Sequence, residues 1–552
     1  MLVALVLLVV SACAATPAPK SEIPFAARSW PAGGDAPCAV DATGAKRTGL
    51  RRIVAVSELS VRFDLCAPDP AFVQKLAVPN FAVQDSGWLT AAIADGSLTR
   101  TMNGTGPFSL AAWNKGSQIV LARNDAYWGA HAAAAKLVVQ WQGESAARLL
   151  ALRAGTVDAI DNLAPTDAAS VRSDATLALL PRAGFNTFYV NFNNRYAPFG
   201  DARVRTAVAL ALDRARIVAQ FYPEGSTVAT HVPPCVIALA CGGADWYAQD
   251  LVAARALLAE AGYPNGFDTT LSYRVTPRAY LPNPKEVAID LQAQLAAIGV
   301  RVTLDEREPG SYIDDLLSGR LEGLSFSAAL PDYPEAWNAL GIDFGAESGP
   351  THGDRYPTIV ALLDAAARAR GDAARAAAFT ALNDEIRALV PVIPIANGSS
   401  LIATRADVRD LVASPVATER FATARAGSRD QFTFMQGAEP AGLYCMDEED
   451  REATRLCAQV TEGLYGYAAG STVAEPRLAT GCDVSDDGLS VTCAIRPNVR
   501  FHNGAKLDAA DVLDSFAAAW DCAHPLHVGR TGDFRAWSWI MGTLNPDRCA
   551  AP

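Results

Sequence analysis

Histidine and cysteine are the side chains in this sequence best suited to ligating a metal, and the chain has six histidines and eleven cysteines. His524 and His527 lie three positions apart, a spacing that places two imidazoles on one helix face. Pro525 between them disfavours a regular helix. The sequence contains no CxxC pair and no HExxH or GxSxG signature. We therefore expect no metal, no cofactor and no catalytic residue, while a secreted hydrolase with paired carboxylates stays open as an alternative.

The start of the chain indicates export. Residues 1–12 (MLVALVLLVVSA) are apolar except for Ser11, which is typical of the hydrophobic region of a secretory signal. The four residues Val10-Ser11-Ala12-Cys13 resemble a bacterial lipobox, in which the cysteine thiol receives a lipid. No Lys or Arg precedes the apolar block, which departs from that pattern. We predict a lipoprotein signal over 1–13 with lipidation at Cys13, and the alternatives are a wrongly assigned start or a buried strand.

The other cysteines suit disulfides in an oxidising compartment, because ten remain after Cys13 and ten is an even number. Cys482 and Cys493 flank an Asp-Asp-Gly turn signal, so a disulfide across two paired strands is expected there. Close spacing also favours the pairs Cys445–Cys457 and Cys235–Cys241. The sequence leaves open the pairing of Cys38, Cys66, Cys522 and Cys549.

Composition and charge exclude several classes of protein. Of 552 residues, 50% are hydrophobic and 19% are charged, which excludes wholesale disorder. The net charge of -12 and the absence of a Lys/Arg cluster argue against a nucleic-acid partner. The mean hydropathy of +0.11 comes from alanine, because no stretch after residue 12 approaches the ~20 apolar residues of a membrane span.

Strand and helix patterns alternate along the chain and predict an α/β fold. Residues 52–64 alternate apolar and polar side chains like a pair of strands, and single-strand patterns cover Leu137–Trp141, Phe185–Phe192 and Val390–Ile395. Helical periodicity covers 144–155, 201–221, 248–262, 285–299, 356–391 and 508–520. Residues 401–430 carry no strong core pattern and are interpreted as a surface connection.

Four segments resemble the family 5 solute-binding proteins of ABC importers, the peptide/nickel type: GTGPFSLAAWNKGSQIVLARNDAYWG (104–129), LRAGTVDAI (152–160), FNNRYAPFGDARVRTAVALALDRARIV (192–218) and ARALLAEAGYPNGF (254–267). The resemblance implies a two-lobed periplasmic-binding-protein-like fold of type II with an extra subdomain. It also implies a monomeric, extracytoplasmic, non-enzymatic lipoprotein that captures oligopeptides and delivers them to a membrane permease. Alternative solutes are an oligosaccharide, an opine or a metal chelate.

The order of segments departs from the family. A segment resembling 461–516 comes near the mature N-terminus in family 5 proteins, ahead of one resembling 53–81, whereas here it comes last. We therefore predict a circularly permuted chain, with a gene-model or assembly artefact as the alternative. The expected parts are a tether or loop (14–48), part of lobe I (49–105), lobe I with the extra subdomain (106–180), lobe II and the return to lobe I (181–400), a linker joining the family's usual termini (401–430), the lobe I segment that is normally N-terminal (431–545), and a tail (546–552).

The resemblance also suggests ligand-binding residues. AALPDYPEAWNAL (328–340) resembles the family stretch whose aspartate contacts the amino end of a bound peptide, and the matching residue is Asp332. Tyr333 and Trp337 lie beside it. Further candidates for the wall of the cleft are Tyr189, Trp537 and Trp539, and Arg274 and Arg278 are candidates for meeting a ligand carboxylate.

Overall fold

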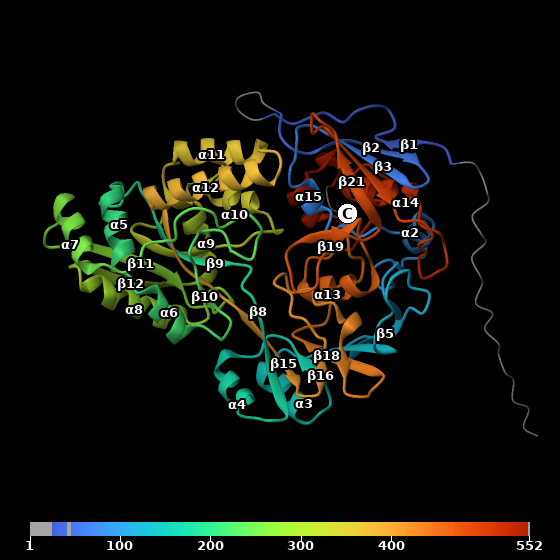
Figure 1. Cartoon of the computed structure of the whole chain (residues 1–552), viewed down its shortest axis with the longest axis horizontal. Helices are drawn as coiled ribbons and strands as arrows, with labels where there is room; N and C mark the ends of the chain where they lie inside the picture. Colours follow the sequence, from blue (N-terminus) through green and yellow to red (C-terminus); the bar gives the residue numbers. More distant parts are fainter. Residues whose placement is uncertain (1–24, 41–45, 550–552) are drawn as a thin grey trace, which may run out of the picture.

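The computed structural model describes residues 25–40 and 46–549, so the predicted lipidation site Cys13 lies outside the described residues. The described chain forms two lobes (Figure 1). Lobe I contains a five-stranded and a seven-stranded sheet, and lobe II contains a six-stranded sheet. Among the described helices, none combines the length and the apolar character that a membrane span requires.

The five-stranded sheet of lobe I is antiparallel and joins segments from both ends of the chain, in the order β1-β2-β3-β22-β21. Its strands are β1 (Arg28–Trp30), β2 (Leu50–Ser57), β3 (Ser60–Leu65), β21 (Ala479–Val484) and β22 (Ser490–Ile495). Helix α14 (Ala509–Trp520) begins with a capping box in which Asp508 and Asp511 satisfy each other's backbone groups. The remaining elements here are α1 (Phe72–Lys75), η1 (Pro79–Phe81), α2 (Ser86–Ala94), β19 (Tyr465–Tyr467), β20 (Ala474–Pro476), α15 (Arg535–Met541) and η5 (Pro546–Arg548).

The seven-stranded sheet completes lobe I, in the order β4-β5-β6-β18-β7-β15-β8. Its strands are β4 (Phe108–Asn114), β5 (Gln118–Arg123), β6 (Lys136–Trp141), β7 (Ala159–Ile160), β8 (Leu177–Arg182), β15 (Ser400–Arg405) and β18 (Gln431–Gln436). The helices and short strands of this part are α3 (Ser145–Arg153), η2 (Pro165–Asp167), α4 (Ala168–Arg172), β16 (Val408–Arg409), η4 (Phe421–Thr423), β17 (Arg425–Ala426) and α13 (Arg451–Val460).

Lobe II is built on a mixed sheet in the order β10-β14-β9-β13-β11-β12. Its strands are β9 (Thr187–Phe192), β10 (Thr227–Val228), β11 (Asp268–Arg274), β12 (Arg301–Arg307), β13 (Leu324–Ala329) and β14 (Val392–Asn397). Its helices are α5 (Ala202–Ala211), α6 (Arg214–Phe221), α7 (Leu251–Glu260), α8 (Pro284–Ala296), α9 (Pro309–Leu317), α10 (Ala336–Phe344), η3 (Pro350–His352), α11 (Pro357–Arg368) and α12 (Asp372–Leu389).

Two short segments connect the lobes, one between β8 and β9 and the other between β14 and β15. The Asn186 side chain donates to the carbonyl of Gly398 and accepts from its amide, at 2.9 Å each. A Cβ on Gly184 would lie 2.7 Å from the Gly398 carbonyl oxygen, so only glycine permits this backbone approach. The two connections are therefore fastened to each other and form a narrow hinge between the lobes.

Most predicted elements are confirmed, with two helices divided. The 201–221 pattern divides at Asp213, whose side chain caps α6, and the 356–391 pattern divides at Gly371, which has a φ of 75°. The predicted disulfides Cys482–Cys493, Cys445–Cys457 and Cys235–Cys241 form, and the open cysteines pair as Cys38–Cys66 and Cys522–Cys549.

Three predicted connections differ from the structure. Residues 401–430 do not form an exposed connection, because β15 lies inside the seven-stranded sheet and Phe421 and Glu419 are fully buried. The predicted loop over 14–48 contributes the edge strand β1. In the predicted tail, Cys549 is tied to Cys522. Each segment gains structure from partners distant in sequence, which a local pattern does not reveal.

Candidate functional site

A cavity of about 510 Å³ lies between the lobes, beside the hinge, and we call it the interlobe cleft. Lobe I supplies η1, the start of α13, the 415–418 loop and Tyr467. Lobe II supplies the end of β11 and the loops that follow β11 and β13, and the hinge supplies Ala183, Asn186 and Gly398. The cavity therefore depends on both lobes, so a ligand inside it contacts both.

Asp332 lines this cleft at the loop that follows β13. Its backbone amide donates to Asn338 Oδ1 at 2.7 Å, and its carboxylate accepts from Asn338 Nδ2 at 3.4 Å. Burial raises the pKa of Asp332, and the Asn338 hydrogen bond lowers it in part. No cation of the described residues forms an ion pair with this carboxylate. Asp332 is thus a carboxylate held in place in the cleft, without a cationic partner among the described residues.

Arg274 and Arg278 also line the cleft, from lobe II. Arg274 Nη2 donates to the hydroxyl of Tyr280, which lines the cleft too. Within the part of the chain that the structure describes, the Arg278 guanidinium donates a single hydrogen bond, a 3.5 Å contact to the carbonyl of Pro277. The structure therefore brings Asp332, Arg274 and Arg278, each a candidate from the sequence, to the lining of one cavity.

Tyr333 points away from the cleft and joins the lobes. Although it belongs to lobe II, its side chain is 4% exposed and packs in the core of lobe I. Lys75 Nζ lies 5.6 Å from the centre of its ring, a cation–π arrangement. Trp337 lies beside it at a separate recess of about 60 Å³. The structure places both residues at the lobe boundary, outside the lining of the interlobe cleft.

Other contacts close the two lobes on each other. Arg47 of lobe I forms a two-bond ion pair with Glu347 of lobe II. Arg370 of lobe II donates to the carbonyls of Asp486 and Asp487 in the β21–β22 turn. Thr472 of lobe I donates to the carbonyl of Val236. Together with Tyr333, these contacts describe a closed arrangement of the lobes.

The three remaining aromatic candidates do not line the cleft. Tyr189 is fully buried in the lobe II core. Trp537 is fully buried in lobe I, with its ring centre 4.4 Å from that of Phe81. Trp539 is 65% exposed and faces Arg535. In this closed arrangement Tyr189 and Trp537 serve packing, and sequence reasoning could not separate a buried aromatic residue from a cleft aromatic residue.

A second cavity of about 390 Å³ lies in lobe I and shares four lining residues with the interlobe cleft: Val78, Pro79, Thr418 and Tyr467. We call it the side cavity. Glu462 lines it and is almost fully buried, accepting hydrogen bonds from Tyr127, Trp128 and Thr105 at 2.8–2.9 Å. Burial raises the pKa of Glu462, while these three donors lower it in part. Sequence reasoning missed this cavity because its parts lie hundreds of positions apart.

A buried network of two arginines and two carboxylates lies beside the interlobe cleft, which one of them, Arg182, also lines. Arg182 and Arg455 both bind Asp161 and Glu419, with N–O distances of 2.7–3.0 Å and at most 3% exposure of any side chain. Burial alone would raise the pKa of Asp161, but Arg455 and Arg182 hold it below its usual range. The network joins β8, α13 and the 414–420 loop, and so fixes the hinge side of lobe I.

Comparison with known proteins identifies the family. The model of bacterial extracellular solute-binding proteins, family 5 Middle, matches residues 26–349 and 473–531. These two ranges cover more than half of the chain. The chain belongs to this family.

Several relatives of this family 5 protein are substrate-binding proteins by name. Heme-binding protein A of Haemophilus influenzae is 27% identical over 378 residues, covering 67% of this chain and 69% of the relative. Di/tripeptide-binding protein 1 of Pseudomonas aeruginosa is 27% identical over 392 residues, covering 67% of this chain and 70% of the relative. The probable ABC transporter periplasmic-binding protein SapA of Escherichia coli is 27% identical over 372 residues, covering 66% of this chain and 67% of the relative. The chain is therefore a family 5 substrate-binding protein of ABC transporters.

Solved structures give the same fold. HbpA2 of Haemophilus parasuis matches with a TM-score of 0.62 and 25% identity, covering 68% of this chain and 74% of that one. A dipeptide-binding protein of Pseudoalteromonas sp. SM9913, solved in complex with Met-Leu, matches with a TM-score of 0.53 and 23% identity. The match covers 68% of this chain and 76% of that one. The family 5 protein thus has the type II periplasmic-binding-protein fold.

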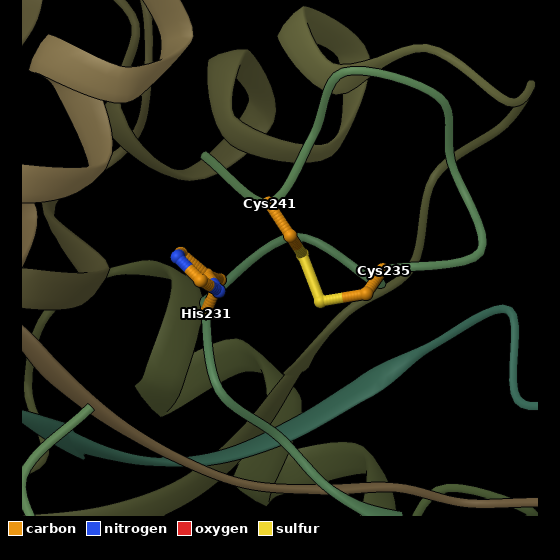
Figure 2. Close-up of side chains that lie close together, drawn as sticks. All are labelled: His231, Cys235 and Cys241. Carbon is orange, nitrogen blue, oxygen red and sulfur yellow. A yellow bond between two sulfur atoms is a disulfide. The ribbon is translucent and has the colours of Figure 1, made fainter. Parts of the chain in front are cut away.

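Two histidine–cysteine groups in the described chain have ligand atoms close enough for a metal, and both contain a disulfide. His231 lies beside the Cys235–Cys241 disulfide (Figure 2), and His527 lies near the Cys522–Cys549 disulfide. Sulfurs bonded to each other are not available as thiolate ligands. His527 also has both ring nitrogens at carbonyls, those of Ala518 and Gly532. The disulfide-bonded form therefore presents no thiolate-based metal site at either group.

Proposed function

We propose that this family 5 protein captures oligopeptides in the interlobe cleft and delivers them to the permease of an ABC importer. The observation that carries the proposal is Asp332, a carboxylate in the cleft that has no cationic partner among the described residues. An ammonium group of the ligand would supply that partner, since a charge-assisted hydrogen bond is stronger than a neutral one.

Binding in this arrangement favours the closed lobes. A ligand that contacts both walls of the cleft stabilises the closed state relative to an open one, by the difference of its affinities for the two states. Tyr333, the Arg47–Glu347 pair and the Arg370 contacts already hold the closed lobes together. The protein then needs no catalytic residue, because capture and release depend only on opening at the hinge.

The peptide proposal is supported by relatives named for di/tripeptide and dipeptide binding. We place the protein outside the cytoplasm, held at the membrane by a lipid on Cys13, as a monomer. Electrospray mass of the purified protein tests the anchor: a diacylated N-terminal cysteine is expected, and an unmodified residue 13 in the mature chain would contradict it.

Isothermal titration with trialanine tests the function. Loss of a hydrogen-bonded charge costs about 1.5–3 kcal/mol, so Asp332→Asn is expected to weaken binding by about 10- to 150-fold. Asp354→Asn is a matched control, because Asp354 lies in lobe II with its side chain 74% exposed and outside the cleft. Unchanged affinity in Asp332→Asn would refute the anchor, and failure of the wild type to bind any peptide would refute the function.

Heme is a second candidate ligand, because one of the relatives is named heme-binding protein A. Absorbance titration with hemin distinguishes the two ligands. The peptide proposal predicts no saturable change in the Soret band at micromolar protein, while stoichiometric binding that peptides do not displace would favour heme.

We also propose that the chain is circularly permuted. Strand β22 of the C-terminal segment pairs with β3 of the N-terminal segment, and β18 pairs in parallel with β6, so each sheet of lobe I takes strands from both parts. Proteolytic mapping of the native protein by mass spectrometry tests the order. A peptide that spans residues 421–429 is expected, and complete coverage on both sides without any such peptide would contradict the permutation.

A further inference from the structure

The two adjoining cavities are rich in arginine and poor in acidic residues. Six arginines line them: Arg182, Arg274, Arg278 and Arg451 in the interlobe cleft, and Arg420 and Arg477 in the side cavity. The acidic residues among the lining are Asp332 and Glu462. This excess of positive charge contrasts with the net charge of -12 of the whole chain. A cleft lined by one sign of charge concentrates ligands of the opposite sign.

Two of the six arginines are neutralised by the protein itself. Arg182 is held by Asp161 and Glu419, and Arg477 is paired with Glu475. The other four form no ion pair with any residue that the structure describes. Arg274 and Arg278 belong to lobe II, whereas Arg420 and Arg451 belong to lobe I. Unpaired cations therefore approach the cavities from both lobes when the lobes are closed.

Arg451 is the clearest example of unbalanced charge. It lies at the start of α13, next to the buried network in which two arginines already face two carboxylates. Although Arg451 is exposed at the surface of the cleft, the surrounding protein and the charge of Arg182 lower the pKa of Arg451, with Asp161 opposing in part. Arg451 forms no ion pair with any residue that the structure describes, so an anion entering the cleft would relieve its repulsion with Arg182.

Arg420 is the corresponding arginine of the side cavity, because it lines that cavity and forms no ion pair with any described residue. Burial and the charge of Arg477 lower its pKa to about 10, although Glu462 and Glu475 oppose that effect. The side chain of Glu462 is already occupied by three hydrogen-bond donors. Because the two cavities share Val78, Pro79, Thr418 and Tyr467, the side cavity that Arg420 lines adjoins the cleft and offers space for a ligand side chain.

We propose that the ligand is an acidic peptide, with its ammonium at Asp332, its terminal carboxylate at Arg274 and Arg278, and an acidic side chain at Arg451 and Arg420. This inference rests on the proposed function and specifies its substrate class. An anion held between arginines of both lobes also links the charge of the ligand to closure of the lobes. Closure brings these positive charges closer together, and an anionic ligand balances them.

Three tripeptides of matched size test the inference by isothermal titration: Ala-Glu-Ala, Ala-Gln-Ala and Ala-Lys-Ala. Ala-Glu-Ala is expected to bind at least tenfold more tightly than Ala-Gln-Ala, and Ala-Lys-Ala most weakly. The ratio should shrink between 50 and 500 mM NaCl because salt screens charges that solvent reaches. Equal affinity of the Glu and Gln peptides, or preference for Lys, would overturn the inference and leave the proposed function standing. Failure of all three to bind would refute the proposed function as well.

Charge substitutions separate the arginines from general effects on the fold. Arg420→Gln with Arg451→Gln is expected to bring the Glu-to-Gln affinity ratio close to one. The conservative pair Arg420→Lys and Arg451→Lys keeps the charge and should keep a preference for Glu. Arg301→Gln is the control, because Arg301 is exposed and paired with Asp268 on lobe II, away from both cavities. A ratio that survives in the double Gln variant would overturn the assignment.

Discussion

Asp343 is expected to destabilise lobe II as pH rises from about 4 to 7, and Asp343→Asn should remove that effect. Its carboxylate lies 4.0 Å from Nε2 of His352, and the ring of His352 lies near that of Tyr189, with 6.1 Å between ring centres. Burial raises the pKa of Asp343 from 3.8 to about 7, and the interaction with Tyr189 lowers it in part. Ionising this carboxyl group in the folded protein therefore costs more than it does in the unfolded chain.

The pKa values determine the size and direction of the effect. Roughly three pH units between the folded and unfolded pKa, at about 1.36 kcal/mol each, correspond to about 4 kcal/mol. Because the folded pKa is the higher one, the stability contribution is fully present below pH 3.8 and is lost as pH rises to about 7. His352 acts in the opposite direction, since burial lowers its pKa from 6.5 to about 3. The difference between Asp343→Asn and wild type isolates the carboxyl group.

Urea unfolding of both proteins at pH 4, 5, 6, 7 and 8 measures that difference. We expect the advantage of Asp343→Asn to grow with pH by up to about 4 kcal/mol and to level off above pH 7. Asp354→Asn, an exposed change in the same region, should show no such growth. A pH-independent difference, or an advantage that shrinks as pH rises, would refute the reasoning.

Three further predictions concern closure and stability. Tyr333→Ala removes the side chain that inserts into lobe I and should enlarge the radius of gyration measured by small-angle scattering. The control Trp539→Ala, at an exposed residue, should leave the radius of gyration unchanged. Identical scattering of Tyr333→Ala and wild type would contradict this prediction. Glu419→Gln leaves Arg182 and Arg455 undercompensated and should cost about 3–5 kcal/mol in urea unfolding, with a loss below 1 kcal/mol as the refuting result. Replacing both Cys482 and Cys493 by Ala should cost about 3 kcal/mol, because the bridge closes an 11-residue separation, and an unchanged unfolding midpoint would argue against that contribution.

Local patterns were sufficient for much of the fold. The alternation over 52–64 predicted the β2–β3 pair, and the Asp-Asp-Gly turn between Cys482 and Cys493 predicted both a hairpin and its disulfide. These features depend on neighbours within about a dozen positions, which a sequence displays directly. The position of Asp332 in the cleft was also expected, through resemblance of its surrounding segment.

Features that depend on long-range packing were not predictable in the same way. Tyr333 and Asp332 are adjacent in sequence, yet one packs in the core of lobe I and the other lines the cleft. Arg420 lies in a segment without core periodicity, and its significance appears only when Glu462 and Tyr127 are brought beside it. Glu419 was assigned to a surface connection because a buried charge looks like an exposed one in sequence; its partners Arg182 and Arg455 explain why it is tolerated inside.

Native mass spectrometry of the full chain incubated with an equimolar mixture of tripeptides tests the central claim most directly. The proposed function predicts a one-to-one complex that survives desalting, dissociates when the protein is unfolded, is enriched in acidic peptides and is depleted in Asp332→Asn. Ions of the unliganded protein alone, under conditions that preserve the folded charge-state distribution, would contradict it.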